Sequence, residues 1–197
     1  MAGLDFIPGI REAEARYREE QIEAFAGVEP DICRMIAVLP FTPQMFIELS
    51  GAGNALLEAK QVSPIDVAQF LWRVSPGFDR FDAGKRQTFN LCVAILPFDQ
   101  AVDEILEYVR RAWEPMPMWP GGSGATPSAG VWPSRIVDLF ASEYGWLEEY
   151  TLNLPFRRLW QYANRVLERK NEKYTQRCPE SLRLRQKWLE EANRPQS

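Results

Sequence analysis

The sequence predicts an all-α protein, a small irregular helical bundle with a Pro/Gly-rich linker and a C-terminal helical element. Apolar residues recur at spacings of three and four in several segments, and no segment shows the sustained polar/apolar alternation of a half-buried strand. Ser, Thr and Pro stand where these segments begin, and Gly stands where they end. With 197 residues, of which 46% are hydrophobic, the chain can bury a substantial core.

The first two helices are expected at residues 10–27 and from Pro43 onward. Residues 10–27 favour helix by propensity, but their apolar face is thin, so we expect an arm that docks weakly. Thr42 is placed to cap the second helix, with Pro43 at its first position. Small residues at 50–54 end that helix.

The clearest helix start is Ser63-Pro64-Ile65-Asp66, which combines a capping serine, a proline at the first position and an acid at the third. The segment that follows is apolar on nearly all faces and stops at Ser75-Pro76. A helix of this kind is buried, so residues 64–74 are predicted to be the centre of the core.

Two further helices are expected at residues 82–95 and after Pro97. The second is strongly amphipathic, with charged residues facing outward. Its inward positions are predicted to be Val102, Ile105, Leu106, Val109 and Trp113.

Residues 114–131 contain four prolines and four glycines, which indicates a flexible linker or long loop. We therefore expect three parts. Residues 1–114 form a helical core domain with an N-terminal helical arm, residues 115–131 a flexible linker, and residues 132–197 a C-terminal helical element with a basic charged tail.

Beyond the linker, a helix at 134–144 is expected to end at Gly145, which can adopt positive φ. A short helical turn then carries Trp146 and Tyr150, and Pro155 starts a long helix. The apolar stripe of that helix is Phe156, Leu159, Trp160, Ala163, Val166 and Leu167. Leu184 and Trp188 indicate one last helix in the tail.

The chain has no histidine, which removes the commonest general base and metal ligand. Its three cysteines form no CxxC pair; Cys33 and Cys92 lie among apolar residues and are expected to be inert packing residues. Paired carboxylates could still support chemistry, but no motif points to them. We therefore expect a protein that is not an enzyme and that uses no cofactor or metal.

Charge is uneven along the chain. Residues 1–114 carry 11 Lys/Arg against 18 Asp/Glu, whereas residues 115–197 carry 12 against 9. The basic excess at 157–187 could form a nucleic-acid-binding face, but interspersed acids and the net charge of −4 favour an ordinary solvated surface, so nucleic acid is not the expected partner. No apolar run reaches the length of a membrane span and no signal peptide is recognisable, so a cytoplasmic protein is expected.

Two stretches resemble a known family. Residues 35–54, with Leu-Pro-Phe-Thr-Pro and a Ser-Gly-Ala-Gly-Asn break, and residues 63–76 resemble the N-terminal half of some tailed-bacteriophage tail assembly chaperones. Residues 142–162, with Tyr-Gly-Trp and Leu-Pro-Phe, resemble a pattern towards the C-termini of phage tail accessory proteins.

The resemblance implies a helical, non-enzymatic virion-assembly protein of the host cytoplasm. Such a chaperone binds the long helical tape measure protein, or other phage tail and virion proteins, before the tail tube polymerises around it. An apolar face that accepts amphipathic helices is then expected. The candidate partner-binding residues are Trp146, Tyr150, Phe156, Arg157, Trp160 and Tyr162.

Two alternatives remain open. The protein could be a structural virion component, such as a tail completion, connector or decoration protein, in which the linker and tail become ordered on assembly. It could also be a nucleic-acid-binding module that uses the basic residues at 157–187. Whether it forms a homo-oligomer is left open.

Overall fold

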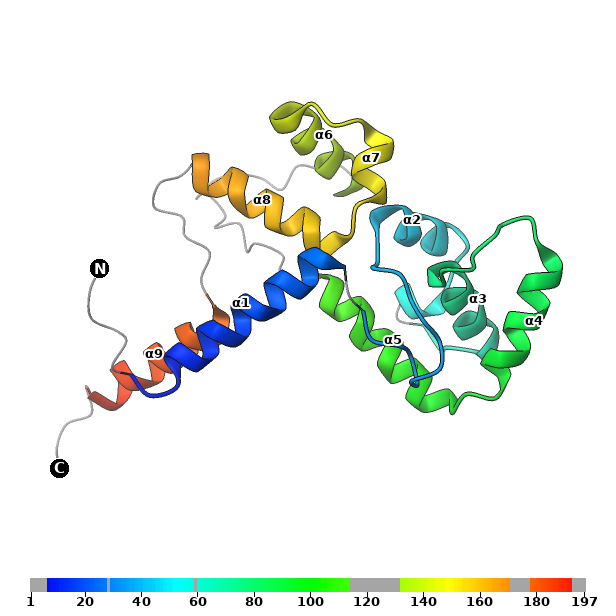
Figure 1. Cartoon of the computed structure of the whole chain (residues 1–197), viewed down its shortest axis with the longest axis horizontal. Coiled ribbons are helices and arrows are strands. Elements are labelled where there is room, and N and C mark those ends of the chain that lie inside the picture. Colours follow the sequence, from blue (N-terminus) through cyan, green and yellow to red (C-terminus); the bar gives the residue numbers. More distant parts are fainter. Residues whose placement is uncertain (1–6, 28, 59, 114–131, 171–177, 193–197) are drawn as a thin grey trace. The chain divides into compact units, whose positions relative to one another are not determined.

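The computed structural model describes residues 7–27, 29–58, 60–113, 132–170 and 178–192 (Figure 1). These residues form nine α-helices and one 3₁₀ helix, and the described ranges contain no strand. Their one extended pairing is an isolated bridge between Ile32 and Ile36. The predicted all-α fold class is confirmed.

The chain divides into two compact units. The larger comprises residues 27–163, and the smaller comprises residues 1–26 together with 164–197. The division expected at residues 115–131 falls on a segment outside the described residues. Helices from both sides of that segment belong to the larger unit, because their aromatic side chains share one core.

The starts of α2 (Pro43–Gly51) and α3 (Pro64–Val74) follow the predicted capping rules. The Thr42 hydroxyl accepts a hydrogen bond from the Met45 N–H at 3.2 Å. At α3, Ser63 and Asp66 form a capping box, and the Asp66 carboxylate also accepts a bond from the Ala55 N–H in η1 (Ala55–Leu57). One side chain therefore both starts α3 and ties the preceding turn to it.

Helix α3 is central to the larger unit and packs against α2, η1, α4 (Ala83–Ala94) and α5 (Phe98–Trp113), as Figure 1 shows. Phe70, Leu71 and Val74 are fully buried. The prediction that this helix forms the centre of the core is confirmed. Its first residues depart from that picture, because Ile65 is 77% exposed.

The buried face of α5 includes Ile105 and the partly buried Val102, Val109 and Trp113, as predicted, but it leaves out Leu106 and adds residues that the prediction did not name. Ala101, Ile105, Tyr108 and Ala112 face the core, whereas Leu106 is 44% exposed. The prediction counted aliphatic residues and tryptophan and left out Tyr108, whose ring is the largest fully buried side chain of the described residues. Burying that ring turns the helix so that Leu106 points outward.

The extended segment at 39–41 connects three helices of the larger unit. Leu39 N–H donates to the Val74 carbonyl at the end of α3, and the Tyr108 hydroxyl donates to the Leu39 carbonyl at 2.6 Å. The Phe41 carbonyl accepts from the N–H of Phe156 at 2.9 Å. The Phe41 ring lies 5.6–5.8 Å from those of Phe70, Tyr108 and Phe156. The backbone N–H and carbonyl groups of this extended segment thus form their hydrogen bonds with helix ends and side chains.

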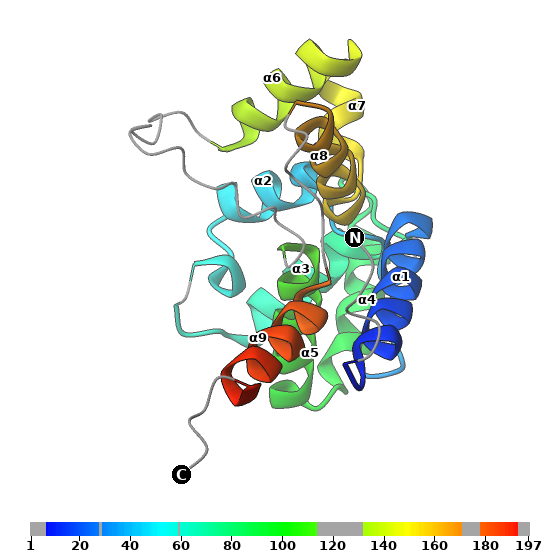
Figure 2. The same cartoon turned by 90° about the vertical axis from the view of Figure 1, so that its left-hand side faces the viewer.

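The last helices of the larger unit lie together (Figure 2). They are α6 (Trp132–Tyr144), α7 (Glu148–Asn153) and the first half of α8 (Phe156–Lys170), which continues into the smaller unit. Gly145 ends α6 with φ of +68°, and Pro155 precedes α8, as predicted.

In the smaller unit, α1 (Ile10–Ala26) and α9 (Pro179–Ala192) run antiparallel and side by side (Figure 1). Buried Ala13 faces Cys178, whose sulfur lies 3.5 Å from the Ala13 carbonyl oxygen. Arg16 donates two hydrogen bonds to the Glu180 carboxylate, at 2.9 and 3.0 Å. Gly27 ends α1 at φ of +76°. The predicted helix and its stop are confirmed.

The three thiols differ in exposure. Cys178 is buried and Cys33 is half-buried, whereas Cys92 is exposed on α4. The expectation that Cys92 packs inward was wrong, because Phe89 and Val93 supply the inward face of α4 and Cys92 lies beside it. Among the described helices, none has the length and apolarity to cross a membrane.

Candidate partner-binding site

The structure separates the six predicted partner-binding residues into two groups. Trp146, Tyr150 and Tyr162 come together near the surface of the larger unit, where they join Phe140 and Tyr144. We refer to these five residues as the aromatic cluster. Phe156 and Trp160 are buried in the core, and Arg157 takes part in a buried ion-pair group.

Trp146 is the centre of the aromatic cluster. Its ring stacks on those of Phe140 and Tyr144, at centroid distances of 5.2 and 4.9 Å and interplanar angles near 20°. Tyr150 and Tyr162 meet it edge to face, at 5.2 and 5.0 Å. Both are arrangements that aromatic quadrupoles favour. The five rings hold one another in place before any partner arrives.

The backbone around Gly145 makes this assembly possible. The Gly145 N–H donates to the Ala141 carbonyl at 3.0 Å, which is the single bond of an αL helix cap. The Trp146 N–H reaches the Phe140 carbonyl at 3.3 Å. This reversal folds Trp146 back against the helix that precedes it, so residues close in sequence stack face to face.

The aromatic cluster borders solvent. Tyr150 is 53% exposed and the neighbouring Leu147 is 77% exposed, while Trp146 and Tyr162 are half-buried. Glu148 and Glu149, in the first turn of α7, are exposed as well. The surface thus combines fixed aromatic rings, an exposed leucine and negative charge.

Phe156 and Trp160 contribute to stability and present no surface to a partner. Phe156 is fully buried, and its ring lies 4.5 Å from that of Trp113 and 5.9 Å from that of Trp160. The Trp160 indole N–H donates to the Ala112 carbonyl at the end of α5, at 3.0 Å. Their helical spacing correctly predicted an apolar stripe on α8, and this stripe packs in the core of the larger unit.

Arg157 faces inward, where it and Arg111 flank the Glu29 carboxylate at 3.9 and 3.2 Å. The Glu29 side chain is only 5% exposed. Burial raises the pKa of Glu29, and the two guanidinium groups oppose that rise. Arg165, further along α8, pairs with Glu168. Arg157 and Arg165 are therefore each paired with a carboxylate.

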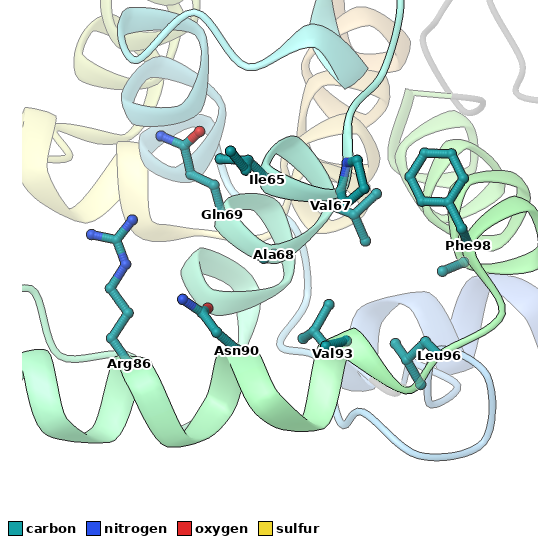
Figure 3. Close-up of a pocket in the computed structure, with 12 residues that line it drawn as sticks. Ile65, Val67, Ala68, Gln69, Arg86, Asn90, Val93, Leu96 and Phe98 are labelled. Atoms are coloured by element: carbon teal, nitrogen blue, oxygen red, sulfur yellow. The ribbon is translucent and has the colours of Figure 1, made fainter.

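The structure also contains a surface that sequence reasoning missed, a groove between α3 and α4 that the start of α5 closes (Figure 3). Ile65 was assigned to the core because its helix is apolar on most faces. Helical spacing could have predicted that Ile65 is exposed, because it lies on the side of the helix opposite the apolar stripe formed by Val67, Phe70, Leu71 and Val74. For Arg86 and Phe98, which also line the groove, no pattern in the neighbouring sequence indicated that they would lie at a binding surface.

Within the described ranges, no group of three His, Cys, Asp or Glu side chains is placed to hold a metal ion. Comparison of the chain with family models, with curated proteins and with solved structures finds no match.

Proposed function

We propose that this protein is a non-enzymatic tail assembly chaperone of a tailed bacteriophage, which acts in the host cytoplasm. The observation that supports the proposal best is the aromatic cluster beside exposed Leu147 and Tyr150. Trp and Tyr held in fixed positions next to an exposed aliphatic residue form the kind of surface that supplies most of the affinity in protein interfaces.

The client that we propose is the tape measure protein, a long and largely helical chain. Before the tail tube encloses it, such a chain exposes apolar stripes that it cannot bury alone. The stripe of an amphipathic helix can cover Leu147 and Tyr150 and rest on the edge of Trp146. Glu148 and Glu149 at the same place favour clients with basic residues beside the stripe, and they would speed association at low salt.

Co-expression with the phage's tape measure protein tests the proposal. We expect the two chains to co-purify, and we expect Leu147→Ala or Tyr150→Ala to weaken the complex by about tenfold or more. Both side chains are exposed, so these variants should fold normally. Phe81→Ala is the matched control, because Phe81 is 91% exposed and lies outside the aromatic cluster.

Mass spectrometry of purified particles separates a chaperone from the main alternative. A chaperone is absent from mature virions, whereas a tail completion, connector or decoration protein is present in stoichiometric amounts. Finding the protein at such levels in particles would reject the chaperone proposal.

A further inference from the structure

The groove between α3 and α4 is an open cavity of about 340 Å³ with two different ends. Figure 3 shows Gln69, Arg86 and Asn90 gathered at one end, while Val93, Leu96 and Phe98 lie at the other. Ala68 and Ile65 of α3 line the wall between them. An occupant must therefore be apolar along most of its length and polar at one end.

The polar end favours an anion. Arg86 is the one charged side chain among the residues that line the groove. The described part of the chain places no carboxylate against its guanidinium and no hydrogen-bonding partner against the Asn90 amide. Arg86 and Asn90 stand one helical turn apart on α4, so both can reach the same group. A carboxylate matches this pair, since it can accept bonds from guanidinium and amide together.

The apolar lining of the groove is partly open to solvent. Ile65 and Phe98, which both line it, are 77% and 38% exposed. A small molecule seated in the cavity would leave these side chains in water, whereas a protein helix laid along the groove can cover them.

We propose that this groove binds an amphipathic helix of a partner protein, which places one Asp or Glu carboxylate on Arg86 and Asn90 and its apolar stripe along Ile65, Val93 and Phe98. This site is separate from the aromatic cluster in residues and in charge. The aromatic cluster, with Glu148 and Glu149 beside it, favours a basic helix, whereas the groove, with Arg86, favours an acidic one. The protein can therefore hold two different helical segments.

Two synthetic 15-residue peptides test the proposal with the full-length protein. Both are alanine-based helices with leucines at positions i, i+4 and i+7, and they differ in a single Glu or Lys one turn before the first leucine. In ¹⁵N NMR titrations we expect the Glu peptide to shift the resonances of residues 65–69 and 90–98. It should bind about three- to fivefold more tightly than the Lys peptide, a ratio set by one exposed ion pair.

Charge reversal provides the decisive comparison. Arg86→Glu should invert the preference so that the Lys peptide binds more tightly. Arg18→Glu makes the same charge change at an exposed position of α1 and should leave the preference as it is. Ile65→Asp should weaken both peptides at least tenfold, whereas Ile22→Asp, at an isoleucine of α1 that is 63% exposed, should not.

Equal affinity of the two peptides for wild type and Arg86→Glu would overturn the proposal. So would groove shifts caused by sodium dodecanoate while neither peptide produces them, because the site would then bind small amphiphiles. Tyr150→Ala separates the two proposals: it should weaken tape measure binding by about tenfold or more and leave the peptide titration unchanged.

Discussion

At the scale of single residues, Tyr108 shows how one polar atom can fix a buried ring. Its hydroxyl donates to the Leu39 carbonyl, and its ring contacts Phe41 and Phe70. Burial raises the pKa of Tyr108 well above its ordinary value, with Glu29 adding to the rise. The phenol therefore stays neutral when an exposed tyrosine would ionise.

We expect Tyr108→Phe to lower the free energy of unfolding by about 1–2 kcal/mol, because the Leu39 carbonyl loses its partner in a buried place. The wild type should lose stability as the pH rises above about 10, since the unfolded chain then ionises Tyr108 while the folded protein does not. The variant should lack this part of the alkaline loss. Urea unfolding at pH 7 and pH 10.5 measures both effects, and Tyr150→Phe, on the exposed Tyr150, serves as control.

Asp66 should affect stability at low pH, as Tyr108 does at high pH. The hydrogen bond from the Ser63 hydroxyl lowers its pKa; burial opposes this, and the Ala55 and Ser63 N–H groups lower the pKa further. Asp66→Asn should cost about 1 kcal/mol at pH 7, the usual cost of a lost cap. Because the folded pKa lies below the unfolded one, this difference should shrink as the pH falls through the folded pKa.

Thermal unfolding between pH 2 and pH 7 measures the Asp66 effect, and Asp103→Asn on the exposed side of α5 is its control. A constant difference across that range would contradict the assigned role. The cap itself was predictable, because Ser63, Pro64 and Asp66 are neighbours in sequence and the rule that governs them is local. The role of Ala55 was not, because it depends on how η1 folds back onto α3.

At the scale of elements, Gly145 decides where α6 ends and how Trp146 meets it. We expect Gly145→Ala to destabilise the protein by about 1 kcal/mol, because an alanine at φ of +68° is strained although no atom lies within 4 Å of the added Cβ. Gly51→Ala has the same open surroundings without positive φ, and should be neutral or stabilising. Near-UV circular dichroism of the aromatic cluster, together with thermal unfolding, compares the two variants.

Helix positions were largely predictable because caps, prolines and glycine stops act over a few residues. The face that each helix buries was less predictable. The stripe on α8 was read correctly from spacing, but the same spacing cannot tell a core stripe from a binding face, and Phe156 and Trp160 belong to the core. On α5, the aliphatic pattern held at Val102, Ile105 and Val109 but missed Tyr108 and placed the exposed Leu106 inward. The aromatic cluster was predictable only in part, since Tyr144 joins Tyr162 through tertiary packing.

At the scale of the whole molecule, the pairing of α1 with α9 joins the two ends of the described chain. Such a pairing spans more than 160 residues, and no local pattern encodes it. Composition suggested a boundary at the Pro/Gly-rich segment, whereas contacts divide the chain near residues 26 and 163. Proline and glycine mark where a chain avoids regular structure, but the shared core determines which helices form a unit.

We expect Arg16→Glu to speed hydrogen exchange of the backbone amides in α1 and α9 and to leave those of α3 and α5 unchanged, if each unit opens by itself. Adding Glu180→Arg should restore part of the protection. The coupling between the two sites should be about 0.5 kcal/mol, as for other exposed ion pairs. Faster exchange throughout the chain would show that the two units open together.

The exposure of Cys92 gives the molecule a built-in attachment point for a reporter. Cys178 is buried, and burial, helped by Glu104, raises the pKa of Cys33 and lowers the share of reactive thiolate there. A short treatment with a thiol-reactive, polarity-sensitive dye should therefore label Cys92 first. The dye would then stand between Leu91 and Val93 on α4, about 100° around the helix from the groove residue Val93, and it would report on the exposed side of α4 while Arg86 and Ile65 stay intact.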